Sequence, residues 1–340
     1  MKMKKNNLQP ALRQFFEEYL PSTKGVSDNT VHSYRYTFRL LLQFLFERNG
    51  TLPAKADFDD LEGDTVPEFL KWLEQARNCS ASTRNQRLAA IRSFSKFASH
   101  YCFQPSLAFG TSVSALPRKK AVKKAMAYMT KEEMAIVLSL PRNNTLAEKR
   151  DRVLLSVLYA SGARAQELCD LRIRDVRFEK GKAHLHLNGK GKKARIVVIP
   201  EDCTALLAHY MKRSHFLDCT DPERHLFSSQ THEHMTISCV EGIVKKYIKQ
   251  ARGLHPELFR ESSYTPHSFR HSVAVHMLEA GIPLPVIKNF LGHSSLETTM
   301  IYATISQELR DKYLVDYNAS RTLSQTDGDD DGLDYPDYLR

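Results

Sequence analysis

The stretch TPHSFRHSVAVHMLEAGIPLPVIKNFLGHSSLETTMIYA, residues 265–303, combines a helical pattern with a histidine–tyrosine pair. His267 and Arg270 are three residues apart, which places both side chains on one face of a helix. Near the end of the stretch, His293 precedes Tyr302 by nine residues. A histidine at a turn and a tyrosine in a core are ordinary features, so the rest of the chain must decide whether they act together.

The segment around His293 predicts the start of a helix. Ser294 and Glu297 have the spacing of a capping box, so we expect the helix to begin just after His293. Backbone N–H groups at such a start favour a nearby anion. Nine residues at about 100° each put His293 and Tyr302 on opposed faces of one straight helix. If both serve one site, the chain must bend between them.

Length and charge limit the class of protein. A chain of 340 residues is long enough for two domains, each with its own core. The net charge is +10, and residues 321–340 carry −4, so the remainder carries +14. This surplus indicates a polyanionic partner, most simply nucleic acid, although ribosomal and membrane-surface proteins share it. No apolar run is long enough to cross a membrane, and the basic start lacks a secretory signal, so we expect a cytoplasmic protein.

Cysteine and histidine spacing argues against a metal site. The six cysteines are scattered and form no C-x-x-C pair, which fits a reducing compartment. His184 with His186, and His232 with His234, are possible pairs of metal ligands. Neither pair has a third ligand nearby in the sequence, so we expect no metal at either.

The N-terminal part of the chain has helical apolar spacing in four segments. Four helices within about a hundred residues predict a compact helical domain over residues 1–105. The predicted helices are 8–20, 28–48, 65–77 and 82–100.

The fourth predicted helix has a basic, polar first half and an apolar second half. A helix that packs with one part and reads DNA with its N-terminal half has this pattern, although a solvated face would look the same. The predicted DNA contacts on this helix are Thr83, Arg84, Asn85 and Arg87.

Residues 106–125 break the helical pattern and predict a linker. They contain Gly110 and Pro117, followed by five basic residues within 118–124. A basic linker contacts phosphates if it crosses a duplex, but it is equally consistent with a solvated tether. The candidate contacts here are Lys119 and Lys120.

A second domain is predicted over residues 126–316. Helical segments are interrupted at 178–200, where alternating apolar residues and a turn at NGKGKK predict β-strands joined by hairpins. Helical sequence returns from 201 onward, and the acidic end at 317–340 is typical of a disordered tail. The predicted fold is therefore mainly α with a small antiparallel β-sheet.

Two further stretches carry polar residues at functional spacings. In YASGARAQELCDL, residues 159–171, Arg164 and Glu167 are three apart and share a helix face. Lys190 stands at the tip of the glycine-flanked hairpin in NGKGKKARI.

With these motifs in place, the chain resembles the tyrosine recombinases, the phage-integrase and Xer-like site-specific DNA recombinases. The resemblance covers residues 8 to about 316 and rests on GARAQEL (162–168), NGKGKKARIVVIP (188–200) and the stretch 265–303. It implies an N-terminal four-helix (SAM-like) core-binding domain and an α+β catalytic domain. It also implies a clamp around double-stranded DNA.

The resemblance assigns the chemistry of phosphoryl transfer to named residues. Arg164 and Arg270 would clamp the phosphate, for which planar bidentate donors are suited. His293 would donate a hydrogen bond to it, and Tyr302 would be the nucleophile. The product would be a 3′-phosphotyrosine bond, which needs neither metal nor ATP, so no cofactor is expected.

The remaining roles concern protons and support. His267 is the expected proton acceptor or orienting partner of the tyrosine. The family's hairpin lysine, matched by Lys190, would protonate the 5′-hydroxyl leaving group, with Lys192 and Lys193 as near alternatives. Lys192 is also a candidate DNA contact. Glu167 more plausibly braces the neighbouring arginine than takes part in chemistry.

The resemblance also implies assembly and a choice of biological roles. Two protomers would occupy each recombination site and a tetramer would join two sites, with residues 306–316 docking on a neighbouring protomer; accessory proteins are left open. We expect a recombinase of a mobile element, acting in integration, excision or transposition. The alternatives are an Xer-type chromosome or plasmid dimer resolvase, a catalytically silent DNA-binding protein, and a type IB topoisomerase-like enzyme.

Overall fold

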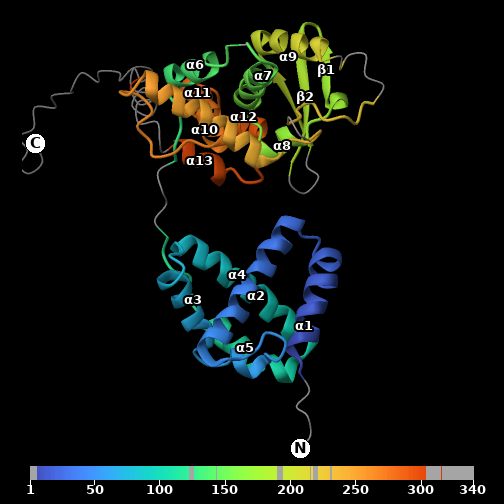
Figure 1. The fold of residues 1–340 in the computed structure, drawn as a ribbon, viewed down its shortest axis with the longest axis vertical. Coiled ribbons are helices and arrows are strands. Elements are labelled where there is room, and N and C mark those ends of the chain that lie inside the picture. Colours follow the sequence, from blue (N-terminus) through green and yellow to red (C-terminus); the bar gives the residue numbers. More distant parts are fainter. Residues whose placement is uncertain are drawn as a thin grey trace, which may run out of the picture. The chain divides into compact units, whose positions relative to one another are not determined.

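The computed structural model describes residues 6–121, 126–142, 144–189, 194–214, 216, 221–229, 232–303 and 315. The chain divides into two compact units between residues 124 and 125. Figure 1 shows a helical first unit and a second unit in which helices accompany a small sheet. Within the described ranges, every helix is too short or too polar to cross a lipid bilayer.

Helix boundaries in the first unit follow local capping chemistry. Before α4, the hydroxyl of Ser80 accepts a hydrogen bond of 3.3 Å from the backbone N–H of Thr83. Helix α2 ends where Gly50 takes a left-handed φ of 72°. The elements are α1 (Leu8–Gln14), η1 (Phe15–Thr23), α2 (Asp28–Asn49), η2 (Phe58–Leu61), α3 (Thr65–Gln75), α4 (Ala81–Tyr101) and α5 (Phe103–Ala115).

Aromatic rings form the core of the first unit. Phe94 of α4 is fully buried and meets Phe15 and Phe38 edge to face, with ring centroids 5.3 and 5.0 Å away. Phe58 stacks against Phe94 with an interplanar angle of 5°. Burying one such ring contributes roughly 2–3 kcal/mol, and each favourable ring pair adds about 1 kcal/mol. Helix α4 therefore organises this unit.

The linker predicted for residues 106–125 is wrong at its start, because residues 106–115 belong to helix α5. Phe109 and Val113 of this helix are buried in the aromatic core. Pro105 lies in the first turn, where a missing N–H breaks no helical hydrogen bond. Burial of one apolar face thus outweighs Pro105 and Gly110, residues that by themselves favour a break in a helix.

The second unit contains a three-stranded antiparallel sheet in the order β1-β2-β3. His184 of β2 pairs with Arg177 of β1 and with Val198 of β3. The elements are α6 (Lys131–Ser139), α7 (Leu146–Ser161), α8 (Ala165–Cys169), η3 (Ile173–Asp175), β1 (Val176–Glu179), β2 (Lys182–Asn188), β3 (Ala194–Ile199), α9 (Glu201–Arg213), α10 (Ile237–Leu254), α11 (Pro266–Glu279), α12 (Leu284–Leu291) and α13 (Glu297–Ala303).

Helix α7 forms the centre of the second unit. Its residues Leu154, Leu155 and Leu158 are fully buried, and the helix packs against α9, α11 and β3. The prediction of a mainly helical chain with a small antiparallel sheet is confirmed. The hairpin tip at 190–193, the docking segment 306–316 apart from residue 315, and the tail at 317–340 lie outside the described residues.

Candidate active site

The turn after α7 positions the first arginine of the site. Gly162 has a φ of 55°, and a Cβ there would lie 2.9 Å from Cδ2 of Leu291, so both conformation and space require glycine. The backbone N–H of Arg164 donates to Oε2 of Glu167 at 2.8 Å. Nη1 of Arg164 donates to Oε1 of the same carboxylate at 2.7 Å. The turn therefore fixes both the backbone and the guanidinium of Arg164.

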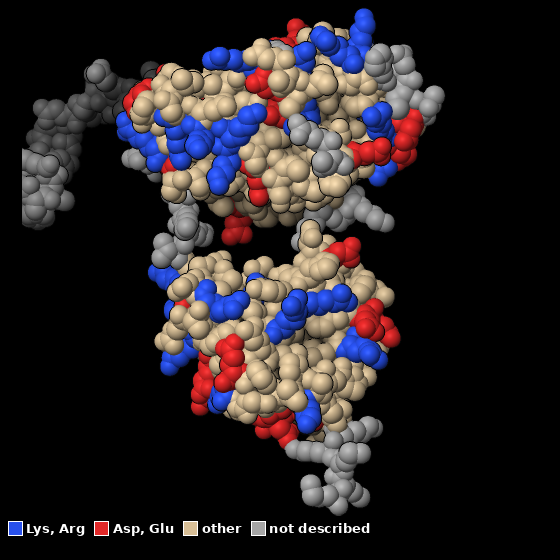
Figure 2. Space-filling model, in the orientation of Figure 1, with Lys and Arg blue, Asp and Glu red and all other residues tan. Residues whose placement is uncertain are grey.

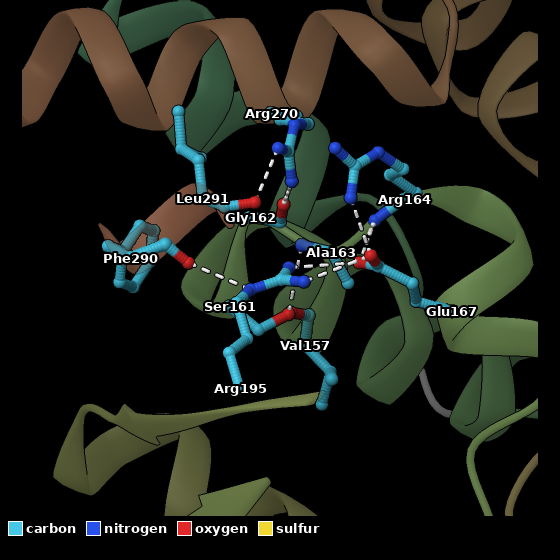
Figure 3. Close-up of polar contacts among 10 residues, drawn as sticks. All are labelled: Val157, Ser161, Gly162, Ala163, Arg164, Glu167, Arg195, Arg270, Phe290 and Leu291. Carbon is cyan, nitrogen blue, oxygen red and sulfur yellow. Dashed lines mark hydrogen bonds and ion pairs between the residues drawn. The ribbon is translucent and has the colours of Figure 1, made fainter. Parts of the chain in front are cut away.

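Glu167 is buried between two arginines, as Figure 3 shows. Arg195 of β3 donates from Nη1 and Nη2 to the two carboxylate oxygens, each at 2.9 Å, and from Nε to the carbonyl of Phe290 at 2.9 Å. Burial raises the pKa of Glu167, but the hydrogen bonds and charge of Arg195, with the contacts of Arg164, outweigh it and lower the pKa overall. Glu167 is therefore an anion that holds both guanidinium groups in place.

Arg270 of α11 is 2% exposed and ties two turns of the chain together. Nη1 donates to the carbonyl of Gly162 at 2.5 Å, and Nη2 donates to the carbonyl of Leu291 at 2.6 Å (Figure 3). Burial and the charges of Arg164 and Arg195 lower its pKa to about 10, so the guanidinium remains protonated at neutral pH. Three arginines around one carboxylate leave a surplus of positive charge that favours an anionic ligand.

His293 lies in the turn between α12 and α13. The capping box predicted for Ser294 and Glu297 is wrong, because α13 begins at Glu297 itself. The backbone N–H of Glu297 bonds instead to Oγ of Ser295 at 3.2 Å. The chain leaves α12 through Gly292 in a left-handed conformation, and the residues after it complete the turn before the next helix can start.

Tyr302 of α13 is 1% exposed, and its ring lies 6.3 Å from that of His293 at an angle of 13°. Nδ1 of His293 is 2.9 Å from Oγ1 of Thr299. The chain thus bends between His293 and Tyr302, which brings the two rings together. Burial raises the pKa of Tyr302 more than Arg270 and Arg164 lower it. Burial and the same arginines lower the pKa of His293 to about 4.

Two histidines on successive turns of α11 adjoin the tyrosine. Nδ1 of His271 is 3.1 Å from the hydroxyl of Tyr302. The ring of His267 stacks on that of His271, with centroids 6.0 Å apart. Burial, with the charges of Arg270 and Arg164, lowers the pKa of His267. Burial, with His267 and Arg270, lowers the pKa of His271 to about 4, so both rings are neutral at pH 7.

The described part of the chain brings five of the six predicted catalytic residues into one site. Glu167 joins them through its contact with Arg164. Lys190, predicted as the proton donor, lies outside the described residues, as does Lys192. The assembled residues are Arg164, His267, Arg270, His293 and Tyr302.

Two side chains of the site, Arg195 and His271, were not predicted. Arg195 precedes an alternating run in which Ile196 and Val198 are exposed, so the period of two already places Arg195 on the opposite, inner face. His271 follows His267 by four residues, so helical spacing places both on one face. In both cases the signal was present in the sequence.

Among the described residues, no group of three or more His, Cys, Asp or Glu side chains is arranged to hold a metal ion. His234, one of the histidines considered as a ligand, lies 3.3 Å from Oδ1 of Asp170 and 4.4 Å, between ring centroids, from His225. His184 and His186 are half-buried on one face of β2.

The polar residues predicted to contact DNA on α4 hold the chain that leaves the first unit. Nδ2 of Asn85 donates to the carbonyl of Lys119 at 2.7 Å, and Oδ1 accepts from the N–H of Lys119 at 2.9 Å. Nη1 of Arg84 donates to the carbonyl of Pro117 at 3.0 Å. Asn85 and Arg84 therefore bind backbone groups just after α5.

The other residues of this region that were predicted to contact DNA differ in how many contacts they make within the protein. Nη1 of Arg87 donates to the carbonyl of Ser33 and to Oγ1 of Thr37, each at 3.1 Å, and its guanidinium lies 4.9 Å from the ring centroid of Tyr36. Arg87 thus joins α4 to α2. Thr83 takes part in the α4 N-cap, Nζ of Lys119 is 2.8 Å from Oε1 of Glu74, and Lys120 is exposed.

Basic side chains also gather over α10 in the second unit, as Figure 2 shows. Lys245, Lys246 and Lys249 are exposed, and Arg252 is half-buried. Lys245, Lys249 and Arg252 follow helical spacing and share a face. Because α10 packs against α8 and α11, the helix that carries this basic stripe adjoins the elements that carry the site.

Two family models match the chain over most of its length. Residues 127–308 match the model described as the phage integrase family. Residues 13–101 match the model for the phage integrase N-terminal SAM-like domain. The two matches fall in the second and first units, respectively.

Curated relatives are similar over nearly the whole chain. An integrase/recombinase-type protein of Sinorhizobium fredii, y4rC, is 31% identical over 312 residues, which is 91% of both chains. The tyrosine recombinase XerA of Pyrococcus furiosus is 30% identical over 89% of this chain and 93% of its own. The tyrosine recombinase XerC of Chlamydia caviae is 28% identical over 87% and 94%.

Solved structures share the fold at lower identity. XerH recombinase in a pre-cleavage complex with its difH substrate has a TM-score of 0.68 at 19% identity, over 92% of this chain and 97% of that chain. The Tn1549 transposon integrase bound to transposon right end DNA has a TM-score of 0.65 at 19% identity, over 92% and 98%. These likenesses show a common fold.

Proposed function

The chain belongs to the phage integrase family of tyrosine recombinases, and from this premise we propose that it cleaves and rejoins DNA through a 3′-phosphotyrosine bond at Tyr302. The observation that carries the proposal is the position of this tyrosine. Its hydroxyl lies in a site whose charge comes from Arg164 and Arg270, both of which act electrostatically on the phenol. A nucleophile beside a surplus of guanidinium groups suits attack on an anionic phosphodiester.

The arginines would stabilise the transition state. Charge accumulates on the non-bridging oxygens as the phosphoryl group transfers, and preorganised donors lower the energy of that state. The contacts with Glu167, Gly162 and Leu291 hold both guanidinium groups before DNA arrives. His293, neutral at pH 7 and bonded through Nδ1 to a threonine, would donate from Nε2 to the same phosphate.

The reaction conserves the energy of the phosphodiester. The bond from phosphorus to the phenolic oxygen forms while the bond from phosphorus to the 5′-oxygen breaks, and the released 5′-oxygen takes a proton. We assign that proton to Lys190, on the family resemblance. A 5′-hydroxyl of a partner strand then attacks the phosphotyrosine bond and reverses these steps, so neither ATP nor metal is required.

We propose that both units contact double-stranded DNA and that protomers assemble on it. The surplus of positive charge and the basic stripe of α10 support contact with phosphates. A dimer on each site and a tetramer joining two sites would account for paired strand exchange, with residues 306–316 docking on a neighbour. We propose a cytoplasmic location, because the similar recombinases come from bacteria and an archaeon, whose DNA is cytoplasmic.

We further propose that the recombinase serves a mobile element. Its similarity to an integrase/recombinase-type relative and its fold likeness to a transposon integrase support this role. Similarity to Xer recombinases supports the alternative, resolution of chromosome or plasmid dimers. Covalent trapping on DNA identifies the cleaved site. A site at the junction between an element and its host DNA would support the first role, and a single chromosomal site far from any element would support the second.

Covalent trapping tests the proposed reaction. Nicked duplexes from the flanks of the gene, or a randomised pool of them, lose a short strand after cleavage and so cannot be religated. We expect a protein–DNA adduct that survives SDS with the native chain and is absent with Tyr302→Phe. A Tyr302→Phe variant that still forms the adduct, or a native chain that binds DNA but never forms one, would contradict the proposal.

A further inference from the structure

The hydroxyl of the nucleophile contacts a histidine that the resemblance leaves without a role. Nδ1 of His271 lies 3.1 Å from the hydroxyl of Tyr302, within hydrogen-bonding distance. In the part of the chain that the structure describes, the tyrosine has no other hydrogen bond with a histidine. His267, the expected proton acceptor, instead stacks on His271 with ring centroids 6.0 Å apart.

We propose that His271 is a catalytic residue that accepts the phenolic proton of Tyr302 during DNA cleavage and returns it during rejoining. This assignment rests on the proposed function. It moves the role of proton acceptor from His267 to His271, and it leaves His267 as a positioning residue that holds the plane of the neighbouring ring.

The proton and electrons balance with groups already in the reaction. The phenolic oxygen forms its bond to phosphorus, and its proton passes to Nδ1 of His271, which must therefore be unprotonated with its hydrogen on Nε2. The bond from phosphorus to the 5′-oxygen breaks, and that oxygen takes its proton from Lys190. In the rejoining step each proton returns, so both residues are restored after every cycle.

The charges around His271 make its basicity depend on DNA. The titratable and charged groups facing it are His267 and Arg270 on its own helix, and His293 and Tyr302 on the segment after α12. Burial, with His267, Arg270 and His293, lowers the pKa of His271 to about 4 in the free protein, so the ring is unprotonated but only a weak base. A bound phosphate would offset the arginine charge and raise this pKa, because a nearby anion favours the protonated ring. Proton acceptance would therefore strengthen when DNA is in place.

The same helix supplies a matched control. Nδ1 of His276 lies 2.8 Å from the hydroxyl of Tyr159, and Nε2 of His276 lies 3.0 Å from the carbonyl of Met129. His276 is buried and Tyr159 is half-buried, and this second histidine–tyrosine pair lies just over one turn beyond His271 along α11. Loss of His276 therefore affects packing of α11 as loss of His271 does, but leaves the proposed proton transfer intact.

The test measures the rate of single-turnover adduct formation on the nicked duplex used for covalent trapping, as a function of pH. The native chain, His271→Asn and His276→Asn are compared. The Oδ1 atom of asparagine can accept the phenolic hydrogen bond but cannot take the proton. We expect His271→Asn to slow adduct formation about 100-fold at pH 7, the usual size of a general-base effect. The rate of this variant should then climb about tenfold per pH unit toward the phenol pKa, while the native rate stays level above pH 7.

A second substrate separates nucleophile activation from leaving-group protonation. When sulfur replaces the bridging 5′-oxygen, the leaving thiolate needs no proton, so we expect this substrate to restore Lys190→Ala but not His271→Asn. A slowed His271→Asn variant with the native pH profile, or one restored by sulfur, would overturn the assignment. A native rate in His271→Asn would do the same. Failure of the native chain to form any adduct would instead overturn the proposed function, and the assignment with it.

Discussion

The proposed catalytic site and the N-terminal half of α4 both contain arginines that the sequence analysis associates with DNA, but their surroundings differ. In the site, Arg270 is 2% exposed and bonds to two backbone carbonyls of its own unit. On α4, Arg84 is half-buried and reaches the carbonyl of Pro117 in the segment that leaves the unit. Arg270 is therefore held inside one unit before DNA arrives, whereas Arg84 holds a segment that leaves its unit.

The largest expected effect comes from Arg270→Lys. One ammonium group cannot serve both carbonyls and also present paired donors to a phosphate. We expect single-turnover adduct formation to fall about 100- to 1,000-fold, the size seen when one transition-state donor is lost. Arg84→Lys is the matched control from α4 and should keep the native rate at saturating protein. Native kinetics in Arg270→Lys would remove the distinction between the two regions.

The next effect concerns the carboxylate that braces the site. Arg195→Met leaves the buried charge of Glu167 with Arg164 alone, and removing one partner of a buried ion pair costs about 3–5 kcal/mol. The double variant Arg195→Met/Glu167→Gln should lose less than the sum of the single variants, because it no longer buries an underpaired charge. Urea unfolding measures all three free energies. If the free-energy losses of the two single variants add up to that of the double variant, Glu167 and Arg195 are not energetically coupled.

A smaller effect follows from the buried histidines. The pKa values of His271 and His293 are lowered to about 4, so between about pH 6.5 and 4 the unfolded chain binds protons that the native site does not. The free energy of unfolding must therefore rise with pH across this window, by at most about 1.4 kcal/mol per pH unit for each histidine. Thermal midpoints of the native chain and His293→Asn, at matched ionic strength, check this. We expect the thermal midpoint of the variant to rise less steeply with pH than that of the native chain. Equal slopes would contradict the lowered pKa of His293.

The smallest effects separate two arginines of α4. Arg84→Ala should reduce the number of phosphate contacts inferred from the salt dependence of DNA binding by about one. It should lower the thermal midpoint less than Arg87→Ala does, because its bond to the carbonyl of Pro117 holds only the exposed chain after α5. Arg87→Ala should lower the thermal midpoint, because it removes contacts with Ser33, Thr37 and Tyr36. Fluorescence anisotropy over a range of KCl concentrations, with thermal melts, distinguishes them. The reverse pattern would show that Arg87 faces DNA and that Arg84 is structural.

Helices and strands with strong apolar periodicity were predictable, and so was the grouping of the site. Arg164, Arg270 and Tyr302 belong to sequence motifs that resemble those of the family. Because these side chains are buried or half-buried, their polar groups must be paired with other groups of the protein. Helix α5 was not predicted, because its proline and glycine disfavour a helix and its apolar face is modest. That face is stabilised only when it is buried in the aromatic core. The start of α13 was misplaced because two adjacent serines offer alternative caps.

The roles of exposed polar residues were harder to predict. The sequence of α4 gives Arg84, Asn85 and Arg87 the same character, yet two of them bind the chain after α5 and one binds α2. Which partner each takes depends on tertiary packing, which periodicity does not encode. His271 was not predicted for a different reason, because the family resemblance gives a role to His267 and none to the histidine one turn later.

Peptide mapping of the trapped complex tests the central claim most directly. After nuclease and protease digestion of the SDS-stable adduct, mass spectrometry identifies the modified residue and the DNA end attached to it. We predict a nucleotide joined through its 3′-phosphate to Tyr302, in the peptide that contains α13. A link to another residue, or to a 5′-phosphate, would contradict the account.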